Sequence, residues 1–542
     1  MEQRSNAAIF PNRVALDKIY IEEKGGILNA LTYASAQYIY KVLEKYGREK
    51  IKRFDEFKTK KLRRTIIHKN AHLDEYFAEL IFRAILPPHL KDIEVSEHVL
   101  MSKEDDTFAK ISWPNGVVFG IHAEETGGAK ALAFFDEHLP DGTRIKPSCS
   151  QLVADEFLGS KIPRSIKKVL DEVNYTDSHK GAHQYNIKNL FFAMHDILFI
   201  IGKNEIDNTP VTKYLTENWK RAIVDSCMTA MIYAYENDLI SDSLSSEEKE
   251  KLERTTKRSL NYFLDHTILK EIKAEQFNME NKEKNVAKDL SRNFKVWDVS
   301  AKSREKKEKF WHQTIDNAVF KDKKTGEITG RQILIIHQVC FALHKCWGEN
   351  IANFIMMHIW QILFQDQICF QEIEKDIRSH LVENEEVKTC FGSFYKSSIS
   401  DIGFKPVQKE TDDRDRELNK ISKLWIYEIN VTNPNYPNVK KVVGSILNKK
   451  NNEEGNDGFG VFILHDKIIN SKAINNGPTV PSQVWSNLSN RIKQVEPDRW
   501  FQLKDEEGDD ADFILNRTKA HQDLLPTNLI DAEFIKETIL NL

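Results

Sequence analysis

The sequence predicts an α/β fold, followed by a helical insertion and a C-terminal α+β domain. Short apolar runs at 65–67, 117–121 and 131–135 have the length and composition of buried strands, and the first is followed by helical periodicity from residue 74. Beyond residue 181 the apolar residues recur mostly at helical spacing, until strand-like runs return after residue 425. We therefore expect an open α/β sheet first and a mixed domain last.

The chain before the first strand is expected to contain one amphipathic helix over residues 27–43. A basic stretch at 48–64 follows it, in which Phe54 and Phe57 lie between many lysines and arginines. This stretch could guide a phosphate backbone by electrostatic attraction. It could equally be a solvated helix face, because acidic residues partly balance its charge.

The first strand leads into a turn that carries His68, His72 and Asp74 just before a helix. In open α/β sheets, ligands bind at the carboxyl ends of the strands. Two imidazoles and a carboxylate at this spacing could hold one divalent cation through mixed nitrogen and oxygen ligands. The alternative is a helix start at which Asp74 only stabilises the first turn.

Two more apolar runs also end in candidate ligands. The run at 131–135 ends directly in Asp136, Glu137 and His138, and the run at 117–121 ends at His122. Further on, an amphipathic stretch at 166–173 leads into 174–179, which we interpret as a polar loop that carries Asp177. Because strand ends of an α/β sheet gather at one edge, these side chains are candidates for one site.

The order of these motifs resembles that of the DHH phosphoesterase superfamily over residues 60–240. His68-x-Asn70-x-His72-x-Asp74 is similar to its first motif, and Asp136-Glu137-His138 stands where the superfamily has Asp-His-His. The match is closest to the melanocyte-proliferating-gene branch of metal-dependent exonucleases, in which the first motif ends His-x-Asp-Glu. The resemblance implies a DHH-like parallel sheet that binds divalent metal, most often Mn²⁺, with Mg²⁺ as the second choice.

Carried over by position, the resemblance implies metal ligands and substrate contacts. His68, His72 and Asp74 would ligate metal, and Asp177 would bridge two metals. Glu137 replaces the central histidine ligand, and His122 is the nearest candidate for the second motif, whose aspartate is not found. The remaining assignments are Asp136 as the residue that orients its neighbours and His138 as the contact to substrate phosphate.

The C-terminal region is expected to be an α+β domain. Strands are predicted at 425–429, 441–446 and 460–464, and helices at 484–495 and 531–540. A further strand at 513–515 precedes Arg517 and Lys519. By resemblance these two residues would bind substrate, and the alternative is an ordinary surface strand end.

Length and composition set the expected organisation. We divide the chain into an N-terminal helical segment (1–60), a DHH-like metal-binding domain (61–240), a helical insertion (241–405) and a C-terminal α+β substrate-binding domain (406–542). The net charge of -4 does not by itself indicate nucleic acid. Six cysteines without CxxC pairs, no secretory signal and no long apolar span predict a cytoplasmic protein outside the membrane, and a homo-oligomer is left open.

These features together predict a metal-dependent phosphoesterase. The leading expectation is an exonuclease that hydrolyses single-stranded RNA or DNA with a metal-activated water. One alternative is a phosphodiesterase of nucleotides or cyclic dinucleotides. A second is a homologue without catalysis that binds nucleic acid or protein as a scaffold.

Overall fold

A computed structural model of the chain describes a set of separate segments. They are 26–47, 51–54, 60–68, 71–86, 94–99, 115–121, 131–137, 145–160, 162–178, 185–191, 217–263, 315–316, 318–321, 327–379, 383–400, 423–433, 460–467, 470–477, 480–497, 499–504, 510–516 and 529–541, with single positions at 16, 24, 183, 266 and 439. The chain divides into two compact units, the first comprising Met1–Leu100 with Asp106–Gln365 and the second Met101–Asp105 with Asp366–Leu542.

The first unit contains a four-stranded sheet in which every pairing is parallel. Its order is β2-β1-β3-β4. The strands are β1 (Arg64–His68), β2 (Glu94–Val99), β3 (Gly116–Phe119) and β4 (Ala133–Phe135). The predicted α/β class and the three predicted strands are confirmed, and β2 is an addition. Because the strands are parallel, β1, β3 and β4 all end at one edge of the sheet.

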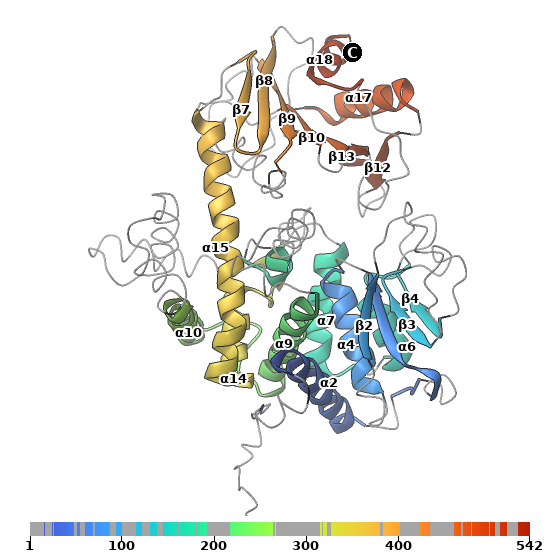
Figure 1. The fold of residues 1–542 in the computed structure, drawn as a ribbon, viewed down its shortest axis with the longest axis vertical. Coiled ribbons are helices and arrows are strands. Elements are labelled where there is room, and N and C mark those ends of the chain that lie inside the picture. Colours follow the sequence, from blue (N-terminus) through green and yellow to red (C-terminus); the bar gives the residue numbers. More distant parts are fainter. Residues whose placement is uncertain are drawn as a thin grey trace, which may run out of the picture. The chain divides into compact units, whose positions relative to one another are not determined.

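Helix α4 (Leu73–Ile85) is the centre of this unit. It contacts α2 (Ile27–Lys45), α6 (Cys149–Phe157), α7 (Arg164–Ser178) and α9 (Glu217–Glu236), as well as β1 and β3 (Figure 1). All thirteen of its residues are buried. The predicted helix at 27–43 is confirmed as α2.

The segment 241–405, expected to be helical, also contains strands. Its described helices are α10 (Ser246–Phe263), α14 (Ile336–Cys346) and α15 (Glu349–Ser379), but β5 (Val319–Lys321) and β6 (Ile328–Arg331) form a hairpin between them. Strands β7 (Glu386–Thr389) and β8 (Gly392–Ser400) lie at its end and pair with the sheet of the second unit. The helical expectation was therefore wrong for these four strands, which are short or mostly polar.

The second unit is built on a seven-stranded mixed sheet, in the order β12-β13-β11-β10-β9-β8-β7. Its further strands are β9 (Lys423–Val431), β10 (Val461–Asp466), β11 (Ser471–Asn476), β12 (Phe501–Lys504) and β13 (Asp510–Asn516). Among its described strands, β9 and β10 pair in parallel and the other strand pairs are antiparallel. The predicted strands at 425–429, 460–464 and 513–515 are confirmed, and 441–446 lies outside the described residues.

Helices pack on both faces of this sheet because its strands alternate apolar side chains between the faces. Trp425 and Tyr427 of β9 belong to one apolar cluster, which also contains Ile373 and Ile377 from the end of α15. Leu424 and Ile426 belong to the other cluster, with residues of α17 (Ser482–Val495) and α18 (Ala532–Leu540). The two predicted C-terminal helices are confirmed.

Two further expectations concern membranes and cysteines. No described helix is both long enough and apolar enough to cross a membrane. Within the described segments Cys149, Cys227, Cys340, Cys346 and Cys390 are thiols that form no disulfide.

Candidate metal centre

Three of the predicted ligands come together at the carboxyl edge of the parallel sheet. His72, Asp74 and Asp177 each offer one ligand atom, and these atoms all lie within 4.8 Å of one another. His72 follows β1 at the start of α4, Asp74 lies in the first turn of α4, and Asp177 lies in the last turn of α7. The strand-to-helix turn and the end of a distant helix therefore form one group.

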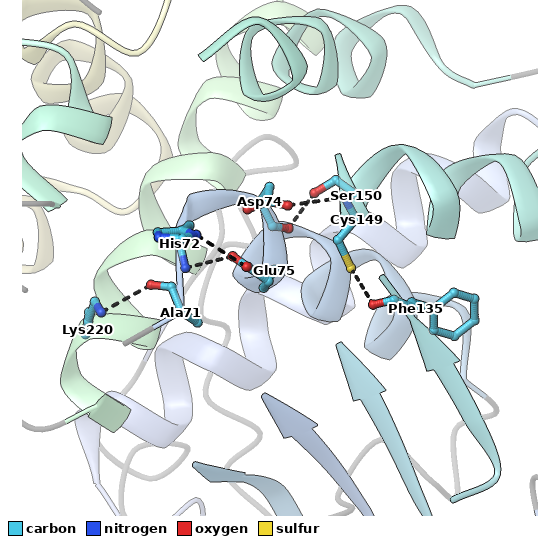
Figure 2. A network of polar contacts seen from close by, with 8 residues as sticks. All are labelled: Ala71, His72, Asp74, Glu75, Phe135, Cys149, Ser150 and Lys220. Atoms are coloured by element: carbon cyan, nitrogen blue, oxygen red, sulfur yellow. Dashed lines mark hydrogen bonds and ion pairs between the residues drawn. The ribbon is translucent and has the colours of Figure 1, made fainter. Parts of the chain in front are cut away.

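Asp74 is the buried member of the group, with 1% of its surface exposed. Its Oδ2 accepts a hydrogen bond of 3.2 Å from the backbone N–H of Cys149, and its carbonyl oxygen accepts one of 2.5 Å from Ser150 Oγ (Figure 2). Its Oδ1 is buried and has no hydrogen-bond partner among the residues that the structure describes. A buried carboxylate oxygen without a donor is unfavourable unless a cation or a proton compensates its charge.

The electrostatic surroundings of Asp74 are strongly negative. Burial, and then the nearby carboxylates of Asp177, Glu75 and Glu137, hold the pKa of Asp74 well above its usual range. Like charges gathered in a poorly hydrated site resist ionisation together. This arrangement favours a bound cation, which would offset the repulsion.

His72 occupies the N-cap position of α4 and is half exposed at its side chain. Its backbone N–H donates to Oε2 of Glu75 over 2.7 Å, which is one half of a capping box. Its Nδ1 lies 3.5 Å from Oε1 of the same carboxylate. Desolvation alone would lower the pKa of His72, but the carboxylates of Glu75 and Asp177 outweigh it and raise the pKa.

The N-terminus of α6 forms another wall of the group. Ser148 caps the helix by accepting the N–H of Gln151 at 3.1 Å, and this places the N–H of Cys149 toward Asp74. The Cys149 thiol donates to the carbonyl oxygen of Phe135 over 3.1 Å. Burial and the charges of Glu137 and Asp74 raise the pKa of this thiol well above its usual value, so Cys149 stays neutral and is no nucleophile.

A small pocket opens onto the group. Its free volume is about 10 Å³, roughly the room that one water molecule or one ion requires. The pocket is lined by His72, Leu73, Asp74, Val173, Thr176, Asp177, Lys188 and Phe191. Its walls therefore include the two carboxylates and the imidazole of the group, together with Lys188.

Lys220 of α9 supports the turn that carries His72. It is fully buried, and its Nζ donates to the carbonyl oxygen of Ala71 at 3.3 Å. The same ammonium lies 4.4 Å from the ring centre of Phe191 and 5.6 Å from that of Tyr76. These contacts stabilise a buried cation and fix the backbone next to His72.

Glu137 and Asp136 do not join the group of three. Glu137 follows β4, is 5% exposed, and influences the pKa of Asp74 and Cys149, but it supplies no atom to the group. Asp136 is half-buried and likewise lies outside the group. His68 is the last residue of β1, and nothing is described of its side chain. The remaining predicted site residues, His122, His138, Arg517 and Lys519, lie outside the described residues.

The expectation of a loop around Asp177 was wrong, because α7 continues to Ser178. Asn174 Nδ2 donates to Gln151 at 2.7 Å, and Asn174 Oδ1 accepts from Ser148 Oγ at 2.6 Å. These contacts with α6 hold a polar sequence of modest helix propensity in the helical state. The helix consequently delivers Asp177 to the site from a rigid element.

Part of the basic stretch at 48–64 serves packing. Lys52 pairs with Glu156, Arg53 donates to the carbonyl oxygen of Ile85 at 2.9 Å, and Phe54 is buried. The ring centres of Phe54 and Phe82 are 5.3 Å apart. Residues 51–54 are not helical, so the alternative of a solvated helix face does not describe these three positions, and their side chains are engaged in contacts within the chain.

Glu75 contacts His72, and Lys220 contacts Ala71 next to it; neither is among the predicted site residues. Glu75 stands where a capping box has its Glu, but His72 is not a usual N-cap residue, so the box becomes evident only from the structure. Lys220 has no signal in the sequence, because its closeness to Ala71 arises only when α9 packs on α4. Sequence spacing reveals local partners far better than distant ones.

Comparisons with known proteins give no relative. No family model, no curated protein and no solved structure matches the chain. The resemblance to DHH phosphoesterases therefore rests on the order of its sequence motifs and stays a prediction.

Proposed function

We propose that this protein is a divalent-metal-dependent phosphoesterase with single-stranded nucleic acid as its leading substrate. The observation that carries the proposal is the convergence of His72, Asp74 and Asp177 within 4.8 Å. It occurs at the edge of a parallel sheet where α/β proteins usually bind their ligands. The choice of nucleic acid comes from the resemblance, and the geometry supports the metal centre.

The three side chains fit a cation of the Mn²⁺ or Mg²⁺ kind. Their donor set is one imidazole nitrogen and two carboxylates, which suits Mn²⁺ better than the softer metals that prefer thiolates. The buried Oδ1 of Asp74, without a described donor, supplies an acceptor in need of positive charge. The pocket has the size of an ion, so the bulk of a substrate would lie outside it.

Several residues of the chain would have separate roles at this site. A bound divalent cation activates water and neutralises phosphoryl charge. Asp74 is held in place by the N–H of Cys149, and Asp177 is held by helix α7. Lys188 at the pocket wall would attract a phosphoryl oxygen to the same place. His138, by resemblance, would contact the substrate phosphate as well.

The test compares two aspartates of the same helix. Purified full-length protein is given labelled single-stranded RNA, single-stranded DNA or a cyclic dinucleotide, with Mn²⁺ or with a chelator. Asp177→Asn should lose release of mononucleotides, whereas Asp171→Asn should retain it, because exposed Asp171 only pairs with Lys167 on the helix surface. Removing a metal ligand costs far more than removing a surface ion pair.

Each outcome has a clear meaning. Mn²⁺-dependent release that Asp177→Asn abolishes supports the proposal and identifies the preferred substrate. Release only from the cyclic dinucleotide would replace nucleic acid with a small substrate. Activity that persists in the chelator would reject the metal dependence. No activity in folded protein under any condition would reject the phosphoesterase and leave the scaffold.

A further inference from the structure

Glu75 uses both carboxylate oxygens on His72. Oε2 accepts the backbone N–H of His72 at 2.7 Å, and Oε1 lies 3.5 Å from its ring Nδ1. Figure 2 shows the two side chains facing each other at the start of α4. The first contact is part of the capping box, but the second has no role in capping a helix.

The structure makes room for this carboxylate at the end of a neighbouring strand. Gly120 follows β3 with φ of +67°, and its N–H donates to the carbonyl oxygen of Phe135 at 2.8 Å. A Cβ at this position would lie 2.5 Å from Cγ and 2.9 Å from Oε1 of Glu75. Any side chain at position 120 would therefore displace the Glu75 carboxylate.

Helix capping alone does not explain a glutamate here. Glu75 is 5% exposed and lies close enough to Asp74 to raise the pKa of that carboxyl. Glutamine would serve the capping box equally well and would avoid burying another negative charge. The charge therefore has a cost, which a role toward His72 would offset.

We propose that Glu75 is the positioning residue of the metal centre, whose carboxylate accepts the Nδ1–H of His72 and thereby leaves Nε2 as the nitrogen that ligates the cation. Metal-binding histidines commonly donate their second ring N–H to a carboxylate, which fixes the tautomer and strengthens the ligand. This inference rests on the metal centre proposed above. It adds a residue that touches neither the cation nor the substrate.

The test uses two glutamates at the same helical position. Glu75→Gln keeps the volume and the capping oxygen but removes the charge. Glu248→Gln does the same at the capping box of α10, where Ser245 N–H donates to Glu248 at 2.8 Å and Glu248 N–H donates to Ser245 Oγ at 3.2 Å. Calorimetric titration with Mn²⁺ should show affinity weakened roughly 10- to 100-fold in Glu75→Gln and unchanged in Glu248→Gln.

A purely structural role would give a different pattern. It would lower the unfolding midpoint of metal-free Glu75→Gln without changing Mn²⁺ affinity. Equal affinities of wild type and Glu75→Gln would overturn the positioning role and leave the metal centre intact. Absence of Mn²⁺ binding by the wild type would overturn both proposals.

A second variant tests the role of Glu75 even if Glu75→Gln does not fold. Gly120→Ala retains the Glu75 carboxylate but moves it, so Mn²⁺ affinity should again fall. Gly159→Ala is its control, because Gly159 also has positive φ, +62°, with nothing within 4 Å of its added Cβ. Wild-type affinity in folded Gly120→Ala would contradict the requirement for Glu75 at its present place.

Discussion

The guanidinium of Arg83 and the carboxylate of Asp225 form a buried ion pair, with Nη2 and Oδ2 2.5 Å apart. The pair joins α4 to α9, and Arg83 Nη1 also donates to the carbonyl oxygen of Thr32 in α2 at 3.2 Å. Burial raises the pKa of Asp225 to about 6, although Arg83 opposes the shift. Helices α2, α4 and α9 are thus tied at one point.

Breaking this pair should destabilise the first unit strongly. Asp225→Asn leaves the Arg83 charge buried without its counter-ion, and we expect the free energy of unfolding to fall by about 3 to 5 kcal/mol. Asp171→Asn, which breaks an exposed pair, should cost less than about 1 kcal/mol. Urea denaturation measures both, and similar losses would contradict the distinction between buried and exposed pairs.

We predict that Glu172 makes the free energy of unfolding depend on pH. Its carboxylate accepts from Leu334 N at 3.1 Å, from Asn186 Nδ2 at 2.6 Å and from Ile333 N, which connects α7 to the chain before α14. Burial outweighs these hydrogen bonds and raises the pKa of Glu172 from 4.5 to about 7. Because the folded-state pKa is the higher one, this contribution to stability is present at low pH and is lost as the pH rises through about 7.

The measurement compares wild type with Glu172→Gln, which does not titrate. Between about pH 5 and about pH 8, the free energy of unfolding of the wild type should fall by about 2 to 3 kcal/mol relative to that of Glu172→Gln. Chemical denaturation at the two pH values gives the difference directly. A constant difference would mean that Glu172 has an ordinary pKa in the folded protein.

We predict that Gly→Ala lowers the stability of the protein more at position 120 than at position 159. Both have positive φ, but only at Gly120 would the added Cβ meet another side chain, that of Glu75. Gly159→Ala should therefore lose about 1 kcal/mol from backbone strain, and Gly120→Ala should lose more. Thermal or urea unfolding tests this order, which equal losses would contradict.

We predict that the stability difference between wild type and Asp74→Asn depends on whether metal is bound. In chelator, Asp74→Asn should be at least as stable as the wild type, because it removes a carboxylate crowded by others. With Mn²⁺ at about 100 times its Kd, the wild type should gain about 2.7 kcal/mol and the variant nothing. Melting scans with Mn²⁺ and with chelator measure both, and a variant stabilised equally by Mn²⁺ would exclude Asp74 as a ligand.

Much of the α/β core could be predicted from local pattern. β1, β3 and β4 are apolar runs of strand length, and α4 has helical apolar spacing from Asp74 onward. Strands β2 and β11 were missed because Glu94–Val99 and Ser471–Asn476 are largely polar. Their state follows from pairing with neighbours, which a linear pattern does not contain.

The candidate site was predictable where its residues are close in sequence. His72 and Asp74 lie in one turn, so the motif alone suggested their joint role. Asp177 was selected for its residue type and its place in the resemblance, yet its helical setting depends on contacts between α7 and α6. Lys220 reaches Ala71 across 149 positions of the chain, and no spacing rule could relate them.

The complete burial of α4 has a consequence for its tolerance of sequence change. A helix with one solvent face, such as α17, which buries Trp485, Leu488, Ser489 and Ile492, accepts most substitutions on its outer side. Helix α4 has no outer side, so a map of accepted residues along Leu73–Ile85 should lack the helical period. Neutral substitutions should therefore accumulate in other elements of this protein. Almost every substitution in α4, the helix that begins directly after His72, should destabilise the fold.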